Sequence, residues 1–448
     1  MLTDPSSPLS KPVGPKIKRE KKLSQKERQR TPAKLQRNTS AKNYIFAATM
    51  MKIGIVREGK IPHDHRVPFT PEQCKYIKEH FSADVVIQPS EWRNYKNEEY
   101  SAQGIPLLED LSDCDILFGI KEVPVEDLIP GKKYLFFSHT IKKQLHNRKL
   151  IKALLEKKIQ MIDYETMTDE HFNRIIGFGH YAGNVGAYNG ILGYGLKYNL
   201  FKTKRAVECH DKKELIDELK KIHLPNLKII VTGNGRVANG AIELLGLLHI
   251  RRITPYEFTH YTFREPTYTQ LHSHNYNEPL DGSQWNTDTF YQHPEKFRST
   301  FMKYTRWCDL LIHCSFWDPR APKLFTKEEM RSPEFGISVI ADVTCDMNGS
   351  IPSTLKASTI AEPFYGYDTR TEQLVGALDK NAVTVMAIDN LPCELPRNAS
   401  EDFGKELIDK VLPSLLQNDK EGLIGRATIT KDGKLLPRFE YLHDYAYL

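Results

Sequence analysis

The chain has 448 residues, of which 40% are hydrophobic and 27% are charged, as in an ordinary globular protein. A chain of this length usually folds as two domains, so a cleft between domains is expected. No apolar run approaches the roughly 20 residues of a membrane-spanning helix, which argues against membrane anchoring. The seven cysteines are scattered and never form a Cys-x-x-Cys pair, so we predict no metal site, no disulfide framework and a reducing, cytoplasmic location.

Charge is unevenly distributed along the chain. Residues 1–50 contain twelve lysines and arginines against three acidic residues, a balance of +9, so the total of +6 leaves −3 for the remainder. A mildly acidic body gives no reason to expect nucleic-acid binding by residues 51–448. We expect residues 1–50 to be disordered, because a polar, basic segment without apolar periodicity cannot offset the entropy lost on ordering.

Three interpretations of this basic extension remain open. Translation could begin near Met50 or Met51, so that the extension is not part of the protein. The segment could be a solvated tail, or it could be a targeting or polyanion-binding arm.

Short apolar strands alternate with helices from residue 51 onwards. A strand at 51–57 precedes a helix with Thr70 as its N-cap and Pro71 at its first position. Further strands are predicted at 84–87, 115–120, 134–137 and 160–163, and helical spacing covers 143–157. This alternation indicates a parallel α/β unit over residues 51–179.

A second α/β unit follows. Its strands are predicted at 227–232, 310–313, 339–342 and 384–387. Residues 258–300 interrupt it with a stretch rich in Tyr, His, Asn and Thr, which shows little periodicity. We expect this stretch to be a surface excursion of the second unit.

A glycine-rich turn lies between the strand at 227–232 and a helical run from Ala241. Its sequence, Gly233-Asn234-Gly235-Arg236-Val237-Ala238, has the form G-x-G-x-x-A. Glycines allow a tight turn and let backbone N–H groups approach a pyrophosphate at a helix N-terminus. The pattern alone could be a bare turn, but its strand-turn-helix context predicts a dinucleotide site.

An acidic residue follows this turn at the distance expected for a ribose contact. Glu257 comes about 24 residues after Gly233, behind a strand predicted at 252–256. An acid there binds the ribose hydroxyls of NAD, so NAD is predicted. Arg251 and Arg252 lie close by in sequence and keep NADP open, and Glu257 could instead be a solvated surface acid.

Lys121 and His139 each follow a predicted buried strand. Open parallel sheets build their sites at the carboxyl ends of their strands, so both side chains could face one site. A desolvated lysine beside a histidine provides two groups that titrate near neutrality. The alternative is a surface lysine and a histidine that is hydrogen-bonded to backbone.

Several ordered stretches, which together run from about 51 to 448, resemble a known family. They include 66–71, 119–121, 137–144, 162–165, 231–241, 342–343 and 388–392. In these stretches the chain resembles the lysine-forming saccharopine dehydrogenases, and more closely the lysine/2-oxoglutarate reductase half of the bifunctional animal enzyme. That group belongs with alanine dehydrogenase and the transhydrogenase alpha subunit.

The resemblance implies roles for individual residues. Lys121 and His139 match the acid-base pair, and Glu122 and Glu165 resemble carboxylates that tune this pair. The substrate-binding positions are Arg66, Gln144, Glu165, Arg174 and Phe178. The nucleotide-binding positions are Gly233, Gly235, Arg236, Glu257, Phe316, Val343, Asp389, Asn390, Leu391 and Pro392. Val343 could also be plain core, and Pro392 could merely end a helix.

The expected fold is α/β, with two Rossmann-like domains of parallel sheets and an interdomain cleft. The substrate domain would be 51–179 completed by 389–448, and the dinucleotide domain would be 180–388. The resemblance implies reversible NAD(P)-dependent oxidation of saccharopine to L-lysine and 2-oxoglutarate, in either direction. The 258–300 stretch has a counterpart in the animal reductase, which generally prefers NADP.

Two alternatives to this function remain. One is an alanine-dehydrogenase-like oxidoreductase, and the other is a non-catalytic nucleotide-binding sensor. Because the chain ends at Leu448 without a second dehydrogenase half, a monofunctional enzyme is expected. The oligomeric state is left open.

Overall fold

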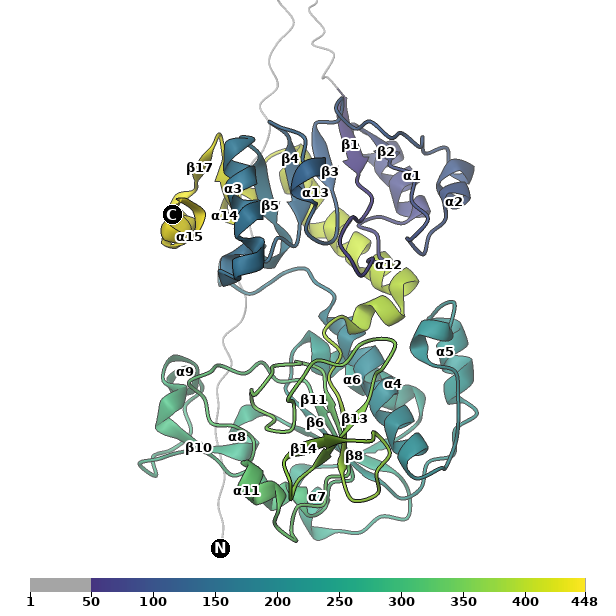
Figure 1. Ribbon diagram of the computed structural model, residues 1–448, viewed down its shortest axis with the longest axis vertical. Coiled ribbons are helices and arrows are strands. Elements are labelled where there is room, and N and C mark those ends of the chain that lie inside the picture. Colours follow the sequence, from purple (N-terminus) through teal and green to yellow (C-terminus); the bar gives the residue numbers. More distant parts are fainter. Residues whose placement is uncertain (1–49, 448) are drawn as a thin grey trace, which may run out of the picture. The chain divides into compact units, whose positions relative to one another are not determined.

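Two largely parallel β-sheets with flanking helices make up residues 50–447, which are the residues that the computed structural model describes (Figure 1). The predicted α/β class is therefore confirmed. Apart from Met50, the expected disordered extension lies outside the described residues.

The first sheet has the strand order β17-β16-β5-β4-β3-β1-β2. Its five parallel strands correspond to those predicted for the first unit: β1 (Met51–Ile55), β2 (Ala83–Ile87), β3 (Ile116–Phe118), β4 (Lys133–Phe136) and β5 (Gln160–Asp163). Two strands from the C-terminal end of the chain, β16 (Thr428–Lys431) and β17 (Lys434–Leu435), extend this sheet in antiparallel fashion. Figure 1 shows the yellow C-terminal segment beside the blue strand β5.

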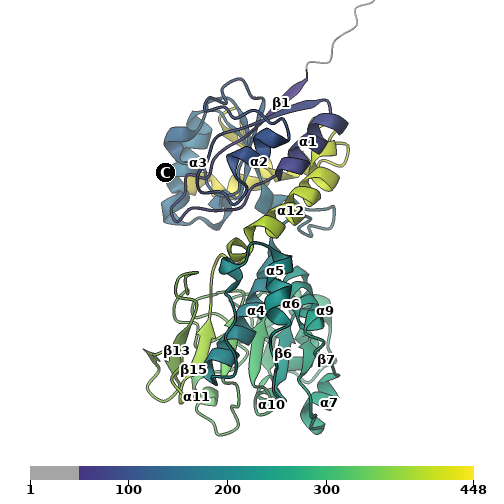
Figure 2. The same cartoon turned by 90° about the vertical axis from the view of Figure 1, so that its right-hand side faces the viewer.

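Helices cover this first sheet. Helix α1 (Pro71–His80) begins as predicted, because the Thr70 hydroxyl accepts the Gln73 N–H and the Gln73 side chain caps the Thr70 N–H in return. Helix α3 (Arg148–Glu156) begins later than expected, because 3-10 turns occupy residues 140–142 and 145–147. The other helices of this part are α2 (Asn97–Ala102), α12 (Pro396–Glu406), α13 (Leu412–Leu416), α14 (Leu423–Ala427) and α15 (His443–Tyr447). Figure 2 shows α12 beside α1, where the Gln73 amide donates to the Glu401 carbonyl over 2.7 Å.

The second sheet has the strand order β14-β13-β15-β12-β11-β6-β8-β7. All four predicted strands are present, as β6 (Lys228–Thr232), β11 (Leu310–His313), β12 (Val339–Asp342) and β15 (Val383–Met386). The remaining strands are β7 (Arg251–Arg252), β8 (Thr267–Leu271), β13 (Tyr365–Asp368) and β14 (Gln373–Val375). Strands β13 and β14 are antiparallel and form one edge.

Part of the segment 258–300, which was expected to be a surface excursion, is a buried strand of the second sheet. Strand β8 lies between β6 and β7, and all five of its residues are buried. Polar Thr and Gln made this segment look exposed, but Thr and Tyr fit a pleated strand and parallel strands are covered on both faces. The rest of the segment forms α8 (Ser273–Tyr276), α9 (Thr287–Gln292) and a hairpin of β9 (Asn277–Pro279) with β10 (Phe297–Ser299).

Helices α4 (Gly179–Lys197) and α6 (Arg236–Leu247) pack with their backbones in contact. A Cβ on Gly183 would lie 1.8 Å from the Val237 carbonyl oxygen, and a Cβ on Gly240 would lie 1.9 Å from the His180 carbonyl oxygen. The last glycine of the 233–240 turn therefore serves helix-helix packing. The remaining helices are α5 (Lys212–Leu219), α7 (Pro255–His260), α10 (Met302–Thr305) and α11 (Lys327–Met330).

Gly183→Ala should lower the free energy of unfolding by about 1–3 kcal/mol, because the added methyl group overpacks this contact. Gly246→Ala in α6 is the matched control, since a Cβ there meets no atom within 4 Å. That change should stabilise the helix by about 0.5–1 kcal/mol. Urea unfolding of both variants measures the difference, and equal stabilities would contradict the packing argument.

All seven cysteines are free thiols, and six of them are buried. Among the helices of residues 50–447, none combines the length and the apolar character needed to cross a membrane.

Candidate functional site

Lys121 and His139 follow the neighbouring parallel strands β3 and β4. Parallel neighbours end at the same edge of a sheet, so the fold brings the two predicted proton-transfer residues to one edge. His139 has φ = 51°, which is uncommon for a residue with a Cβ. Ser138 anchors the segment, because its N–H and its hydroxyl both donate to the buried Asp163 carboxylate.

Glu122 connects His139 to Lys60. Its Oε1 lies 2.7 Å from His139 Nδ1, and its Oε2 lies 2.8 Å from Lys60 Nζ. Burial alone would raise the pKa of Glu122, but the hydrogen bonds from His139 and Lys60 outweigh burial and lower that pKa to about 2. Because a carboxylate only accepts, His139 carries a proton on Nδ1 and presents Nε2 for proton exchange.

The Lys121 ammonium lies in a crowded ionic environment. Burial and then the Arg66 charge lower the pKa of Lys121, while Asp64 and Glu122 partly oppose this shift. A lowered pKa brings a lysine closer to the neutral form that can accept a proton.

Arg66 is buried in an ion pair that was not anticipated from the sequence. Its Nε donates to Asp64 Oδ1 over 2.9 Å and its Nη2 donates to Asp64 Oδ2 over 2.6 Å. Their side chains are only 4% and 2% exposed. Two nitrogens of the guanidinium are therefore bonded to Asp64, since a buried cation requires a partner, and the substrate contact of Arg66 stays a prediction.

Phe178 and Asn390 also surround Arg66. The guanidinium lies over the Phe178 ring at 4.1 Å, and that ring stacks on Phe403 at 4.3 Å. Asn390 Oδ1 accepts from Arg66 Nη2 over 3.0 Å. In this structure the two residues hold Arg66, and their substrate and nucleotide contacts stay predictions.

Glu165 gathers two cations that are half exposed. Its Oε1 lies 3.2 Å from Arg174 Nη2 and 3.3 Å from Lys142 Nζ, and both cations are 50% exposed while Glu165 is 9% exposed. Arg174 thus keeps exposed donors for a ligand, and Lys142 joins it although the sequence did not single it out. Gln144 is also exposed, and its backbone carbonyl accepts from the Tyr445 hydroxyl over 2.6 Å.

The glycine turn after β6 has the geometry of an anion-binding turn. Gly233 has φ = 91°, which favours glycine, and its N–H donates to the Leu271 carbonyl over 2.8 Å. Gly235 is the N-cap of α6, carries no capping side chain, and has open space where a Cβ would be. The first N–H groups of α6 can therefore meet a pyrophosphate, so this turn fits a dinucleotide.

Arg236, the first residue of α6, is held by other parts of the chain. Its Nη1 lies 3.1 Å from Glu406 Oε2, and its Nη2 donates to the carbonyls of Arg174 and Ile175. The predicted nucleotide contact of Arg236 would have to form beside these bonds or replace them.

The strand context predicted for Glu257 is wrong. Strand β7 ends at Arg252, and Glu257 lies in the first turn of α7. Its carboxylate accepts from the Thr254 N–H over 2.8 Å and from the Thr254 hydroxyl over 2.9 Å. The Thr-Pro-x-Glu pattern at 254–257 is a capping box, and this signal was available in the sequence.

Strand β6 lies between β11 and β8, and β8 is the neighbour that comes first along the chain after the glycine turn. The position expected to meet a ribose therefore belongs to the residues that end β8. Gln270 donates to the Gly233 carbonyl over 2.8 Å and accepts from Arg252 Nη2 over 2.8 Å. His272 follows β8, with its ring 5.7 Å from that of His274. Burial, then the charges of His274 and Arg252, lower the pKa of His272. Of these groups, Arg252 is linked to the glycine turn, through Gln270.

The remaining predicted nucleotide residues divide between core and surface. Leu391 is buried in the core, and Val343 packs against it around Gly186 of α4. Pro392 is buried in a 3-10 turn at 391–394. Asp389 is exposed, and Phe316 is 89% exposed.

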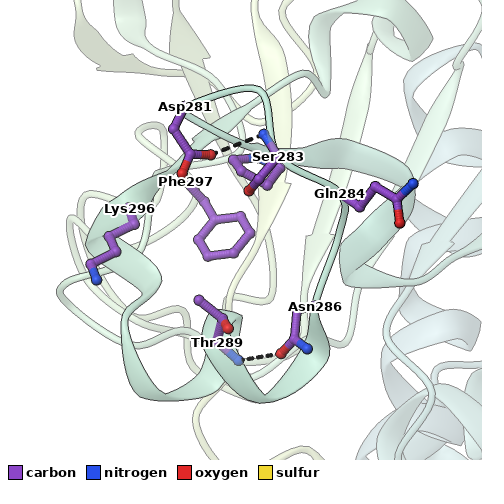
Figure 3. Close-up of a pocket in the computed structure, with 8 residues that line it drawn as sticks. Asp281, Ser283, Gln284, Asn286, Thr289, Lys296 and Phe297 are labelled. Atoms are coloured by element: carbon purple, nitrogen blue, oxygen red, sulfur yellow. Dashed lines mark hydrogen bonds between the residues drawn. The ribbon is translucent and has the colours of Figure 1, made fainter.

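A shallow cavity in the 258–300 segment is separate from these residues (Figure 3). Its lining includes Asp281, Ser283, Asn286, Thr289, Lys296 and Phe297. Its polar groups serve local turns, since Asp281 accepts from the Ser283 N–H and Asn286 accepts from the Thr289 N–H. In the described part of the chain, no cluster of three or more His, Cys, Asp and Glu side chains could hold a metal ion.

Several known proteins and one protein family are similar in sequence to this chain. Residues 54–184 match the family described as alanine dehydrogenase/PNT, N-terminal domain. The chain is 27% identical to alpha-aminoadipic semialdehyde synthase of Arabidopsis thaliana over 437 residues, which cover 87% of this chain and 41% of that protein. It is 28% identical to the mitochondrial synthase of Rattus norvegicus over 434 residues, which cover 86% of this chain and 47% of that protein. The chain therefore spans less than half the length of these relatives.

A shorter relative is covered almost completely. Saccharopine dehydrogenase [NAD(+), L-lysine-forming] of Schizosaccharomyces pombe is 25% identical over 377 residues, which cover 79% of this chain and 90% of that protein. Among solved structures, an L-alanine dehydrogenase matches with a TM-score of 0.59 at 17% identity, covering 88% of this chain and 100% of that one. A transhydrogenase from Sinorhizobium meliloti matches with a TM-score of 0.51 at 16% identity, covering 86% and 98%. These structures support the fold.

Proposed function

We propose that the chain interconverts saccharopine with L-lysine and 2-oxoglutarate by NAD(P)-dependent hydride transfer. The basis is its place in the superfamily of amino-acid dehydrogenases that includes alanine dehydrogenase and saccharopine dehydrogenase. The observation that best supports this reaction is the arrangement of Lys121 and His139 at adjacent strand ends, with Glu122 between His139 and Lys60. This arrangement provides two proton-transfer groups at one edge of the sheet.

The reaction requires proton movements that these two residues can supply. The bound nicotinamide would supply hydride acceptance. Lys121, with its lowered pKa, would exchange the proton of the secondary amine as the carbon-nitrogen double bond forms. His139 would exchange a proton through Nε2 with the water that opens the imine, while Glu122 holds Nδ1.

Cations near this edge fit an acidic substrate. Saccharopine carries three carboxylates, and the Arg174 guanidinium and Lys142 ammonium are half exposed beside the buried Glu165. Because Glu165 neutralises only part of their charge, both cations retain donors for ligand carboxylates. Arg66 would orient the charged groups around Lys121.

The glycine turn and the end of β8 would hold the nucleotide, and we propose NADP(H) in place of the NAD predicted from Glu257. Arg252 donates to Gln270, which in turn donates to the Gly233 carbonyl of the turn, whereas the Glu257 carboxylate is bound to Thr254. A guanidinium stabilises a 2′-phosphate, which an unpaired acid would repel.

Arg252→Ala should lower kcat/KM for NADPH about tenfold or more, because a hydrogen bond to a charged group contributes about 1.5–3 kcal/mol, and should leave NADH use nearly unchanged. Arg251→Ala is the matched control, because that arginine pairs with the exposed Glu265. Steady-state kinetics with both nucleotides measures the effect. Wild-type preference for NADH, lost in Glu257→Gln, would restore the original prediction.

A direct assay tests the proposed reaction. Purified protein is mixed with lysine, 2-oxoglutarate and NADPH or NADH, and nucleotide oxidation is followed. Turnover that depends on both lysine and 2-oxoglutarate supports the proposal. Turnover with pyruvate and ammonia would favour an alanine-dehydrogenase-like enzyme, and nucleotide binding without turnover would favour a sensor.

The free and mostly buried thiols suit a reducing compartment, and we propose the cytoplasm. Fluorescence localisation of the full chain tests this proposal.

A further inference from the structure

Glu58 binds the backbone that carries Lys121. Its Oε1 accepts from the Ile120 N–H over 2.6 Å, and its Oε2 accepts from the Lys121 N–H over 2.9 Å. Both carboxylate oxygens thus act on two consecutive peptide groups. Neither the sequence patterns nor the resemblance singled out this residue.

The strand geometry explains why a side chain is needed here. Strand β1 ends at Ile55, and the last backbone bond on this side runs from the Val56 N–H to the Phe118 carbonyl over 2.9 Å. On the opposite side, β4 continues to pair, because the Phe137 N–H donates to the Ile120 carbonyl over 2.9 Å. The Ile120 and Lys121 N–H groups would therefore lack a backbone partner, and the Glu58 carboxylate replaces the strand that has ended.

We propose that Glu58 is a positioning residue that holds Lys121 in its place for proton transfer. This proposal rests on the proposed role of Lys121 in the reaction. Two hydrogen bonds to one rigid carboxylate fix the position of the Lys121 backbone, and with it the place where the ammonium can meet a substrate. Glu58 acts through Lys121 and exchanges no proton with substrate.

The charges around Glu58 belong to the same ionic group as those around Lys121. Burial, then the Asp64 charge, raises the pKa of Glu58 to about 8, while the two backbone hydrogen bonds and Arg66 oppose this shift. Asp64 and Arg66 also act on the pKa of Lys121. A change at Glu58 should therefore alter the environment of Lys121 and not only the stability of the strand end.

Two variants test the two accepting oxygens. Glu58→Gln keeps the length but presents an amide nitrogen that cannot accept a hydrogen bond, and Glu58→Asp keeps the carboxyl group but cannot reach both N–H groups. Glu109→Gln is the matched control, because Glu109 is an exposed carboxylate that pairs with Arg57 near the same strand. Circular dichroism and NADPH affinity establish that each variant is folded.

The first measurement is the reactivity of Lys121 toward an acetylating reagent across pH, read by peptide mass spectrometry with the exposed Lys149 as internal reference. In wild type, the labelling midpoint of Lys121 should lie below that of Lys149. In both Glu58 variants the labelling midpoint of Lys121 should move toward the midpoint of Lys149 by about half a pH unit or more. The reason is that the backbone segment at Lys121, no longer held by Glu58, admits water. Glu109→Gln should not move it. An unchanged Lys121 midpoint in both Glu58 variants overturns the proposal.

The second measurement is kinetic. Each Glu58 variant should lower kcat about 10- to 100-fold with KM for saccharopine nearly unchanged, as expected for a displaced proton-transfer group. In a Lys121→Met background, Glu58→Gln should cause little further loss, whereas a full additional loss overturns action through Lys121. Absence of saccharopine turnover in wild type would refute the proposed function, and the labelling experiment would still decide whether Glu58 positions Lys121.

Discussion

Lys121→Met and His139→Gln should each lower kcat by about 10²- to 10⁴-fold, the usual contribution of a general acid-base group, while nucleotide binding is retained. The reason is local. Lys121 has a lowered pKa, and His139 is fixed by Glu122 with Nε2 presented for proton exchange. Neither change should remove the second sheet or its glycine turn, which lie elsewhere in the fold.

The pH dependence of kcat/KM is the sharper measurement. Wild type should show one limb from each group, and each variant should lose its own limb because the titrating group has gone. Lys149→Met and His146→Gln are suitable controls, since both residues are exposed near the start of α3. Near-normal rates with an unchanged profile in both site variants would rule out the acid-base assignment.

Arg66→Met should reduce the free energy of unfolding by about 3–5 kcal/mol, because it leaves the Asp64 carboxylate buried without its cation. The loss would extend beyond Asp64, since Arg66 also donates to Asn390 and lies over the Phe178 ring. A second change, Asp64→Leu, should recover much of the stability of Arg66→Met, because the unpaired charge is then removed.

Urea unfolding of the single and double variants measures this coupling. Arg57→Met is the control, because Arg57 pairs with Glu109 at the surface, where such pairs contribute about 0–1 kcal/mol. If Arg66→Met retained full stability and lost only affinity for saccharopine, the original prediction of a substrate-binding arginine would be correct.

The strands were predictable where apolar runs are continuous. All nine strands that were predicted from apolar runs in the two units are present. They could be recognised because strands covered on both faces must be apolar throughout. Strand β8 escaped detection because its Thr and Gln residues look like surface residues, whereas β8 lies inside the sheet between β6 and β7 and all five of its residues are buried. The 252–256 strand was wrong because the capping box at Thr254 and Glu257 starts a helix there.

The sequence by itself determined the α/β class, the glycine turn at Gly233 and the strand-end positions of Lys121 and His139, because each depends on local patterns of a few residues. Only the tertiary structure decided those partners of charged groups that lie far away in the sequence. Arg66 meets Asn390 across 324 positions of sequence, and Glu58 meets Lys121 across 63. These side chains take the partner that the fold brings within hydrogen-bonding distance, and no local pattern encodes a partner so distant in sequence.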